Sequence, residues 1–196
     1  KYVMKKIGKE VLFLSTSEEN PRNGEGCFIK AKDGRIMFVF TQYYGDSWDD
    51  HATARIAAIY SADQGETWTA PEVLVEKGEN DLNLMSISLL RMANGDLGLM
   101  YLRKFMKDEK LLCMPFLIRS SDEGKTFSPA VSVVTEDGYY VVNNDRIARL
   151  KNGRILIPVS RHGDTGIGLH PGYFFACYSD DDGKTWNMSK DEVHSP

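Results

Sequence analysis

The sequence contains few cysteines, no long apolar run and little helical periodicity. Its three cysteines, Cys27, Cys113 and Cys177, are an odd number without Cys-x-x-Cys spacing, so neither a disulfide framework nor a zinc site is expected. Each cysteine lies in an apolar segment, which favours a buried free thiol. No segment reaches the roughly 18 apolar residues of a membrane-spanning helix, and the opening residues, KYVMKKIGKE, lack the apolar core of a signal peptide.

The charge balance excludes further classes of protein. The net charge is −4 and the isoelectric point is near 5.6, so broad nucleic-acid binding is not expected. Apolar residues make up 42% and charged residues 27% of the 196 residues, which is ordinary for a soluble globular protein of one domain or two small ones. No metal-ligand spacing stands out. We therefore expect no metal and no cofactor, and neither nucleic acid nor a membrane as a partner.

The most informative feature is a phrase of eight residues that occurs three times. It reads SADQGETW at Ser61–Trp68, SSDEGKTF at Ser120–Phe127 and SDDDGKTW at Ser179–Trp186, and the first serines are 59 residues apart each time. A short phrase repeated at a constant period indicates a repeat architecture.

The residues of the phrase are those of a self-capped turn. The Asp at the third position can accept backbone N–H groups from the residues that follow, and the Gly at the fifth position supplies a positive φ. The Ser and Thr hydroxyls can tie the ends of the turn together, and the final aromatic residue can pack on flanking strands. The phrase is therefore predicted to be structural rather than catalytic.

Between the phrases, short β-type runs are bounded by Gly, Asn and Asp. In each unit the first two runs are joined by KDGR, ANGD or KNGR, and Asp-Gly and Asn-Gly are the strongest short hairpin signals. Each unit is therefore predicted to be a four-stranded antiparallel meander. The predicted strands are Gly26–Ala31, Arg35–Gln42, Ala54–Ser61 and Glu72–Glu76, then Ser86–Met92, Leu97–Arg103, Cys113–Ser120 and Val131–Thr135, then Arg146–Leu150, Arg154–Ser160 and Tyr173–Ser179.

Meanders repeated at this period predict the blades of a β-propeller, so the predicted fold class is all-β. The runs IMFVF and ILIPV are apolar on both faces, which fits inner strands between neighbouring blades. Propellers have about four to eight blades, so three units, at about residues 22–80, 81–140 and 141–196, are predicted to form roughly half of a larger propeller. A β-solenoid is the structural alternative, although its repeats are usually shorter. We expect exposed blade faces through which two copies could associate.

The fuller sequence pattern carries a resemblance to a known family. The three phrases resemble the Asp boxes of sialidases and related six-bladed propellers, the BNR-repeat group. The resemblance is closer to the bacterial predicted-neuraminidase or exo-α-sialidase-like branch, and it covers most of the chain. It rests on NPRNGEG at Asn20–Gly26, DDHATARIA at Asp49–Ala57, NLMSISLLR at Asn83–Arg91 and VVNNDRIARLKNGRILIPVSRH at Val141–His162.

The topology of a meander sorts the loops onto two rims. Because strands alternate in direction, the first-to-second and third-to-fourth connections share one rim, which carries the Asp boxes and the Gly turns. The long and unlike loops fall on the other rim, and functional residues concentrate in such loops on rigid scaffolds. These loops span Asn20–Glu25, Tyr43–Thr53, Asn80–Met85, Arg103–Lys110, Tyr139–Arg146 and Arg161–Gly172.

Paired carboxylates on this second rim suit glycoside hydrolysis, in which one protonates the leaving oxygen and the other acts on the anomeric carbon or on water. We predict Glu25 and Asp50 as the catalytic pair, with Asp145 as a third candidate. The resemblance implies a role for Asp50, since sialidases carry their acid/base Asp in the second-to-third loop of an early blade. Asp49 and His51 flank it as candidate substrate-binding residues.

Arginines on the same rim are candidate ligands for an acidic sugar. Guanidinium groups bind carboxylates through two hydrogen bonds, and sialidases use three arginines for the sialate carboxylate. Arg146 begins the segment RIARL, which resembles the sialidase Arg-Ile-Pro phrase. The other candidate substrate-binding residues are Arg22, Arg103, Asn144, Arg161 and His162.

The chain departs from the sialidase pattern at Glu25, which stands where blade one carries the arginine of the Arg-Ile-Pro phrase. An acid there would repel a sialate carboxylate, and the tyrosine nucleophile of sialidases belongs to later blades. The resemblance implies a secreted or periplasmic glycoside hydrolase that acts on a terminal sugar of a glycan, acidic or not. Two alternatives remain open. One is a carbohydrate-binding propeller without chemistry, with Trp48 stacked on sugar, and the other is a polysaccharide lyase with a Tyr or His base.

Overall fold

The computed structural model describes residues 8–163 and 172–194. All regular secondary structure in these two ranges is β-strand, which confirms the all-β prediction. The strands are β1 (Asn23–Lys30), β2 (Ile36–Tyr43), β3 (Ala54–Ser61), β4 (Glu72–Val75), β5 (Asp81–Arg91), β6 (Leu97–Lys107), β7 (Lys110–Ser120), β8 (Val131–Ser132), β9 (Tyr139–Val141), β10 (Ala148–Arg149), β11 (Ile155–His162), β12 (Tyr173–Ser179), β13 (Asn187–Met188) and β14 (Val193–His194).

The strands form three antiparallel meanders, which are the predicted blades. The first blade contains β1 to β4 and the second contains β5 to β8. In the third blade β9 and β10 both pair with β11, while β13 and β14 both pair with β12, so its first and fourth strands are each split in two. Single parallel bridges, Ala54 with Asn83 and Cys113 with Tyr139, join neighbouring blades.

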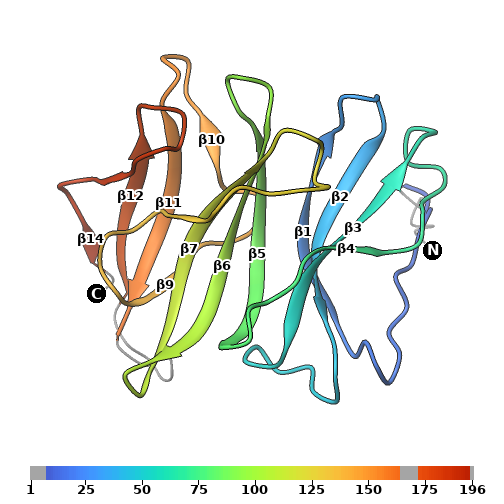
Figure 1. The fold of residues 1–196 in the computed structure, drawn as a ribbon, viewed down its shortest axis with the longest axis horizontal. Coiled ribbons are helices and arrows are strands. Elements are labelled where there is room, and N and C mark those ends of the chain that lie inside the picture. Colours follow the sequence, from blue (N-terminus) through green and yellow to red (C-terminus); the bar gives the residue numbers. More distant parts are fainter. Residues whose placement is uncertain (1–7, 164–171, 195–196) are drawn as a thin grey trace, which may run out of the picture.

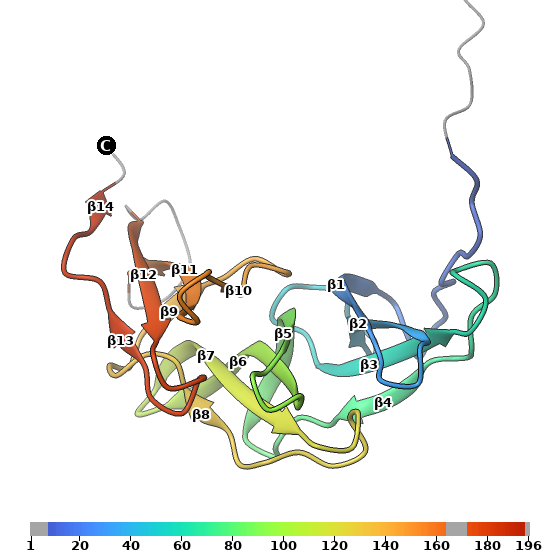
Figure 2. The same ribbon diagram turned by 90° about the horizontal axis from the view of Figure 1, so that it is seen from above.

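Seen from above, the three blades follow an arc (Figure 2). The first strands β1, β5 and β10 lie on its concave side, and the fourth strands β4, β8 and β13 lie on its convex side. In Figure 1 the Gly turns and the repeated phrases lie at the upper rim, which we call the Asp-box rim. The β2–β3 and β6–β7 connections lie at the lower rim, which we call the opposite rim. The two rims are thus separated as the meander topology predicts.

The second blade extends further toward the opposite rim than the sequence indicated. β5 starts earlier than predicted, and β6 and β7 continue until only Asp108 and Glu109 separate them. The predicted loops Asn80–Met85 and Arg103–Lys110 are therefore wrong, because most of their residues belong to strands. The polar residues of the second were interpreted as a loop, but they pair across β6 and β7, and the turn at Asp108 and Glu109 has φ values of +48° and +62°.

The first strand of the third blade is interrupted. The sequence predicted one strand at Arg146–Leu150, but regular pairing is confined to β9 and β10, on either side of residues 142–147. Asp145 has a φ of +55°, which turns the chain out of the β-ladder at this point. We call residues 142–147 the axial segment.

The axial segment lies against the inner strands of the other two blades. The backbone N–H groups of Asp145 and Arg146 donate to β5, at the Ile87 carbonyl (2.9 Å) and the Ser88 hydroxyl (2.8 Å). The amide of Asn144 donates to a backbone carbonyl of β1 at 3.1 Å. The prediction that this stretch is a rim loop is wrong, because hydrogen bonds to β1 and β5 hold it at the centre of the arc.

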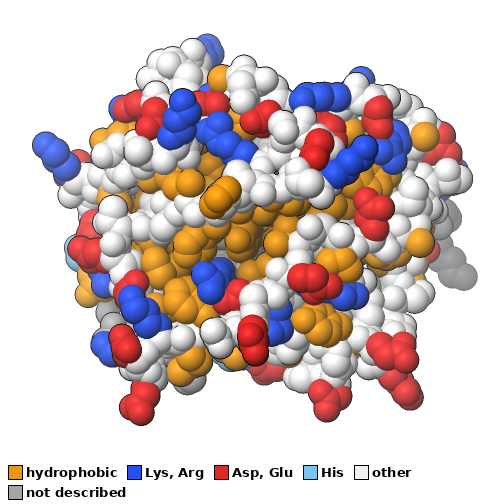
Figure 3. Space-filling model, in the orientation of Figure 1, with side chains coloured by type: hydrophobic (Ala, Val, Ile, Leu, Met, Phe, Trp, Pro, Cys, Tyr) orange, Lys and Arg blue, Asp and Glu red, His pale blue; other side chains and the backbone are white. Residues whose placement is uncertain are grey.

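Apolar layers fill the spaces between blades. Leu97 and Leu99 of β6 pack with Val39 of β2 between the first two blades, and Met100 and Leu102 pack between the second and third. Alternate side chains of one strand therefore enter different layers, and each buried Leu contributes about 2 kcal/mol. Hydrophobic side chains also reach the surface between the two charged rims (Figure 3). The three cysteines are buried and unpaired, as predicted: Cys27, Cys113 and Cys177.

Each Asp box closes on itself. In the first box the Ser61 hydroxyl donates to Asp63 (2.9 Å) and accepts the Gly65 N–H (2.8 Å). Thr67 donates its N–H (2.8 Å) and its hydroxyl (2.6 Å) to the same carboxylate. The same bonds recur in the other two boxes. The predicted self-capped turn is confirmed. In all three boxes, however, the Asp carboxylate accepts the N–H of the Thr four residues later in the chain, and not only N–H groups two or three residues later.

The fourth position of the box also links neighbouring blades, a role that was not predicted. Glu123 accepts the Lys32 N–H of the blade-one Gly turn at 3.0 Å and two bonds from Arg91 at 2.5 and 3.1 Å. Asp182 repeats this pattern with the blade-two Gly turn and with Arg149 at 2.6 Å. We call these contacts the blade clamps.

Candidate functional site

At the blade-one end of the opposite rim, one guanidinium contacts both predicted catalytic carboxylates. Arg22 Nη1 donates to Asp50 Oδ1 at 2.6 Å and to the Trp48 carbonyl at 3.2 Å, and Nη2 lies 4.0 Å from Glu25 Oε1. The guanidinium carbon lies 4.6 Å from the centroid of the Tyr43 ring. We call Arg22, Glu25, Tyr43 and Asp50 the Arg22 cluster.

A β-bulge at the start of β1 shapes this cluster. The β1–β2 register shifts between Asn23 and Gly26, and such a shift bends a strand and redirects its side chains. A Cβ atom at Gly26 would lie 2.2 Å from the Val39 carbonyl oxygen, so the close pairing requires glycine. Beyond the bulge, the Tyr43 N–H donates to the Arg22 carbonyl at 3.0 Å. The backbone of blade one therefore sets the relative positions of the guanidinium and the phenol.

Asp50 is held in its ionised form. The hydrogen bond from Arg22 holds the pKa of the Asp50 carboxyl below its usual range, and the charge of Lys104 acts in the same direction. The Asp50 side chain is 66% exposed, so a ligand can reach it. Its neighbour Asp49 accepts the His51 N–H at 2.8 Å, which closes the turn of this loop.

Two residues that the sequence did not single out anchor the loop of Asp50. Asn83 Nδ2 donates to the carbonyls of Asp50 (3.0 Å) and Ala52 (2.8 Å), and Lys104 Nζ donates to the Asp50 carbonyl at 2.8 Å. Asn83 and Lys104 are paired across β5 and β6 of blade two. Lys104 lies at a buried position of β6 between two less buried neighbours, and continuing the strand pattern of β6 would have identified it. The predicted strand ended at Arg103, so Lys104 was assigned to a loop.

The same end of the arc holds buried polar atoms without a protein partner. Six such side-chain atoms occur in the part of the chain that the structure describes, and four belong to Thr41, Tyr43, His51 and Asn83. Buried polar groups are nearly always satisfied, so a concentration of unsatisfied ones indicates a place for water or a ligand. Burial raises the pKa of Tyr43 to about 12, so its hydroxyl remains a hydrogen-bond donor at neutral pH.

The other predicted rim residues are occupied by partners outside this cluster. Arg103 Nε donates at 2.6 Å to Asp81, whose side chain is only 5% exposed. Arg161 Nη1 donates to Glu136 at 3.1 Å. His162 Nε2 lies 3.1 Å from the hydroxyl of the serine two residues before it. The rest of the predicted loop at Arg161–Gly172 includes residues 164–171, which lie outside the described residues.

The axial segment carries the remaining candidates. Asn144 reaches the carbonyl of Gly26, next to Glu25, so this segment adjoins the Arg22 cluster. Asp145 is exposed and uses its N–H to hold the segment on β5. Arg146 is also exposed, and it lines a cavity of about 280 Å³ on blade three together with Phe174.

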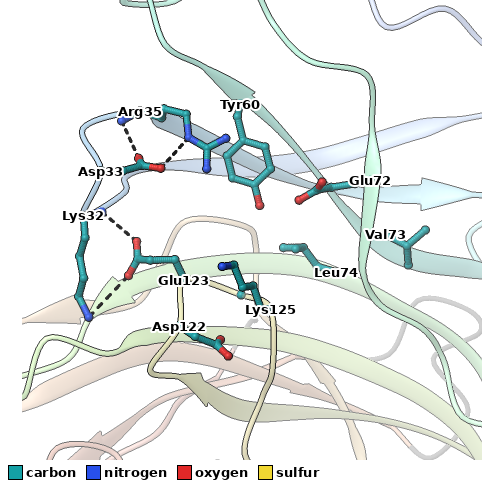
Figure 4. A pocket seen from close by; sticks show the side chains of 11 residues that line it. Lys32, Asp33, Arg35, Tyr60, Glu72, Val73, Leu74, Asp122, Glu123 and Lys125 are labelled. Atoms are coloured by element: carbon teal, nitrogen blue, oxygen red, sulfur yellow. Dashed lines mark hydrogen bonds and ion pairs between the residues drawn. The ribbon is translucent and has the colours of Figure 1, made fainter.

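A further cavity lies on the Asp-box rim (Figure 4). It measures about 640 Å³ and lies between the Gly turn of blade one and the Asp box of blade two. Several of its charged groups already bind one another: Asp33 pairs with Arg35 at 2.8 Å, and Lys32 Nζ lies 3.8 Å from Glu123. Arg35 also stacks 4.5 Å from the centroid of Tyr60. We assign this cavity to the contact between blades.

Two further observations concern metals and membranes. Among residues 8–163 and 172–194, no group of three or more His, Cys, Asp and Glu side chains is arranged to hold a metal ion. The same ranges contain no helix long and apolar enough to cross a membrane.

Comparison with known proteins agrees with the repeats and the fold. The model of the family described as BNR/Asp-box repeat matches residues 59–70 and 178–188, which contain the whole of the first and third boxes. Solved structures that match over most of this chain include sialidases and a trans-sialidase. This chain carries Asp-box repeats and has the sialidase fold. No curated protein sequence matches it.

Three of these sialidase structures show how much of the fold is shared. The Hadza microbial sialidase Hz136 is 15% identical with a TM-score of 0.68, over 87% of this chain and 37% of that one. A mutant of Trypanosoma rangeli sialidase displaying trans-sialidase activity is 17% identical with a TM-score of 0.66, over 87% and 30%. The intramolecular trans-sialidase from Ruminococcus gnavus is 13% identical with a TM-score of 0.63, over 95% and 64%. This Asp-box chain thus spans between about a third and two thirds of their lengths, and the likeness establishes the fold.

Proposed function

We propose that this chain forms part of a glycoside hydrolase of the sialidase-like group, which acts on a terminal sugar of a glycan. The observation that carries the proposal is the Arg22 cluster, in which two carboxylates flank one guanidinium on the rim opposite the Asp boxes. Glycoside hydrolysis needs two carboxyl groups with different protonation states, and a guanidinium between them is one means of separating those states.

Arg22 offers a partner for the carboxylate of an acidic sugar, and we expect Glu25, 4.0 Å from the guanidinium, to weaken that binding by repulsion. The carboxylate of such a sugar would compete with Asp50 for the guanidinium, because both bind it in the same way. Losing this bond would raise the pKa of Asp50, so the bound substrate would help Asp50 to hold the proton that the leaving oxygen needs. Glu25 would then serve as the second carboxylate.

The test is a glycan-release screen on the full-length protein and three variants. We expect Asp50→Asn and Glu25→Gln each to lower turnover by about 10² to 10⁴, the range for loss of a general acid or base. Glu66→Gln, which changes an exposed acid of the first Asp box, serves as the matched control and should retain turnover. Full turnover in both Asp50→Asn and Glu25→Gln would contradict the assignment of the catalytic pair.

One observation favours a second candidate, a carbohydrate-binding propeller without chemistry. The Trp48 side chain is 72% exposed, and its carbonyl is bound by Arg22, so an aromatic surface for a sugar lies beside the cluster. Binding on a glycan array without any released product would favour this function. The lyase alternative needs a phenol or imidazole base, and burial raises the pKa of both Tyr43 and Tyr139 to about 12, which disfavours either phenol as a base at neutral pH. An ultraviolet-absorbing unsaturated product would identify a lyase.

A further inference from the structure

We propose that Lys104 is a positioning residue for the Arg22 cluster: from blade two, it fixes the backbone of the blade-one loop that presents Asp50 to Arg22. The inference rests on the proposed function, because Asp50 has a catalytic role only if the protein is a glycoside hydrolase. Its experiment reads the position and protonation of Asp50, so it remains decisive whether or not the protein releases a sugar.

The burial of Lys104 is the first observation that carries this proposal. Only 3% of the residue is exposed, although it lies on β6 among side chains that face solvent near the turn. Lysines are almost never buried without a partner, since an unpaired ammonium is costly away from water. The partner of Lys104 is the Asp50 carbonyl, at 2.8 Å. This bond crosses from blade two to blade one.

The charge around Lys104 points to the same loop. Burial lowers the pKa of Lys104, while the carboxylates of Asp50 and Asp49 favour its charged form. Cys113 also lies beside it, but burial raises the pKa of this thiol to about 12, so the thiol is neutral at physiological pH and provides no counter-charge. The ring of Tyr139, 5.9 Å away, is a further weak partner. The carboxylates of the blade-one loop therefore stabilise the charge of the buried Lys104 ammonium.

The geometry of the loop shows what this bond controls. The Asp50 carbonyl accepts two hydrogen bonds from blade two, from Lys104 and from Asn83 at 3.0 Å. The Asp50 side chain and the Trp48 carbonyl are both bound by Arg22 of blade one. The loop is thus fixed from two blades at once. A shift of the loop backbone by about 1 Å away from Arg22 would stretch the 2.6 Å bond between Arg22 and Asp50 beyond ordinary hydrogen-bond distance, and a misplacement of this size can lower a rate by about 100-fold.

The charged and titratable groups around Asp50 come from four elements. They are Arg22 and Glu25 at the start of β1, Tyr43 of β2, Asp49 and His51 of its own loop, and Lys104 of β6. Among them, Arg22, Lys104 and His51 lower the pKa of Asp50. Removing the Lys104 charge should therefore raise it.

The experiment compares Lys104→Met with Lys107→Met in the full-length protein. Lys107 lies on the same strand but is exposed, and it pairs with Asp137 at 2.6 Å, so it is a matched control. In Lys104→Met we expect the amides of residues 49–52 to exchange hydrogen about tenfold faster or more, the factor expected for loss of one charge-assisted hydrogen bond. We also expect the pKa of Asp50, followed by carboxyl ¹³C NMR, to rise. Lys107→Met should match the wild type in both measurements.

Unchanged exchange and an unchanged Asp50 pKa in a folded Lys104→Met variant would overturn the proposal. If that variant does not fold, the wild-type protein decides the matter. Its Lys104 ammonium should exchange slowly with solvent and show coupling through the hydrogen bond to the Asp50 carbonyl carbon, whereas rapid exchange without coupling would overturn the proposal. A protein that passes these tests but releases no sugar would retain Lys104 as a positioning residue and lose the proposed hydrolase function.

Discussion

The two rims of the arc contain similar sets of interacting residues that have different roles. On the Asp-box rim, Arg35 pairs with Asp33 at 2.8 Å and stacks 4.5 Å from Tyr60. On the opposite rim, Arg22 pairs with Asp50 at 2.6 Å and stacks 4.6 Å from Tyr43. The same arginine, acid and tyrosine thus occur twice, so their identity alone cannot define a site.

What separates the two rims is how the surrounding polar groups are satisfied. The carboxylates at the third position of the Asp boxes are satisfied within each box, and the blade clamps join the second and third boxes to the preceding blades. On this rim the buried nitrogens without a protein partner, among the described residues, belong to Arg119 and Trp186. Around the Arg22 cluster, by contrast, a buried ammonium is anchored on one carbonyl, and buried atoms of Tyr43 and Asn83 have no protein partner. Repeated polar groups that satisfy one another therefore contribute stability, whereas unlike and incompletely satisfied polar groups favour ligand binding.

Among the variants that compare the two rims, Arg22→Met should have the largest effect. We expect Arg22→Met to lower kcat/KM for glycan release by about 10- to 100-fold, the range for one charge-assisted hydrogen bond, and to raise the pKa of Asp50. Arg35→Met removes the same kinds of contact on the other rim and should leave kcat/KM unchanged. Equal losses in the two variants would remove the distinction between the rims.

Acid should lower the stability that the Asp boxes contribute to the fold, over the range from about pH 4 to about pH 2. Hydrogen bonds from the Thr hydroxyls lower the pKa of Asp63 and Asp122 from 3.8 to about 2, and Asp181 is lowered to the same value in spite of desolvation. Because these folded-state pKa values are depressed, the stability that the carboxylates contribute is present above about pH 4 and is lost as the pH falls toward 2. Urea midpoints measured from about pH 5 to about pH 2 should fall, and Asp122→Asn should make this fall shallower. An identical slope in Asp122→Asn would argue against the linkage.

Removing the buried Ser120 hydroxyl of the second Asp box should lower the free energy of unfolding more than removing the exposed Ser121 hydroxyl beside it. The Ser120 hydroxyl is buried, and it accepts the Gly124 N–H at 2.7 Å. Ser120→Ala leaves this N–H without a partner, so we expect a loss of about 1–3 kcal/mol in the free energy of unfolding. Ser121→Ala is the exposed control and should change it by less than about 0.5 kcal/mol. Urea unfolding followed by circular dichroism measures both, and turnover per folded molecule should be unchanged.

The blade clamp should have a smaller effect. Glu123→Gln removes the charge that holds Arg91 and the Lys32 N–H; Arg91 is partly buried and Lys32 is exposed. We expect a loss of about 1 kcal/mol in the free energy of unfolding, with a weaker dependence on salt than in the wild type. A Glu123→Gln variant as stable as the wild type at low salt would show that the clamp contributes nothing to the free energy of unfolding.

The smallest effect on stability should come from Trp48. Its side chain is exposed, so Trp48→Ala should change the free energy of unfolding by less than about 0.5 kcal/mol. If the ring stacks on sugar, KM should rise several-fold while kcat is retained, since stacking is worth about 1 kcal/mol. Steady-state kinetics on the substrate found in the screen would separate the two constants, and an unchanged KM would remove Trp48 from the site.

Much of the fold could be predicted because its signals are local. The Asp boxes and the Asn-Gly and Asp-Gly turns fix where hairpins occur, and alternation of direction then separates the rims. The features that could not be predicted depend on contacts between blades. The break at the axial segment follows from its hydrogen bonds to β1 and β5, and the extension of β6 follows from pairing that overrides the polar character of Arg103 and Lys107.

The candidate site was only partly visible in the sequence. Arg22, Glu25 and Asp50 were named from their loops, and the structure brings them together. Asn83 and Lys104 were missed, because their role depends on a loop from another blade that folds over them. Residues such as Arg103 and Arg161 have the right chemistry on the right rim, but the structure pairs them with Asp81 and Glu136 instead, and no loop length or spacing reveals that choice.

The most direct test of the division between rims is a hydrogen-exchange footprint of the full-length protein with a glycan identified in the release screen. We expect slower exchange in peptides that cover residues 20–26 and 43–53, where the Arg22 cluster lies, and no change in peptides that cover the Asp boxes at 61–68 and 120–127. Slower exchange confined to the Asp boxes, with none at the Arg22 cluster, would contradict it.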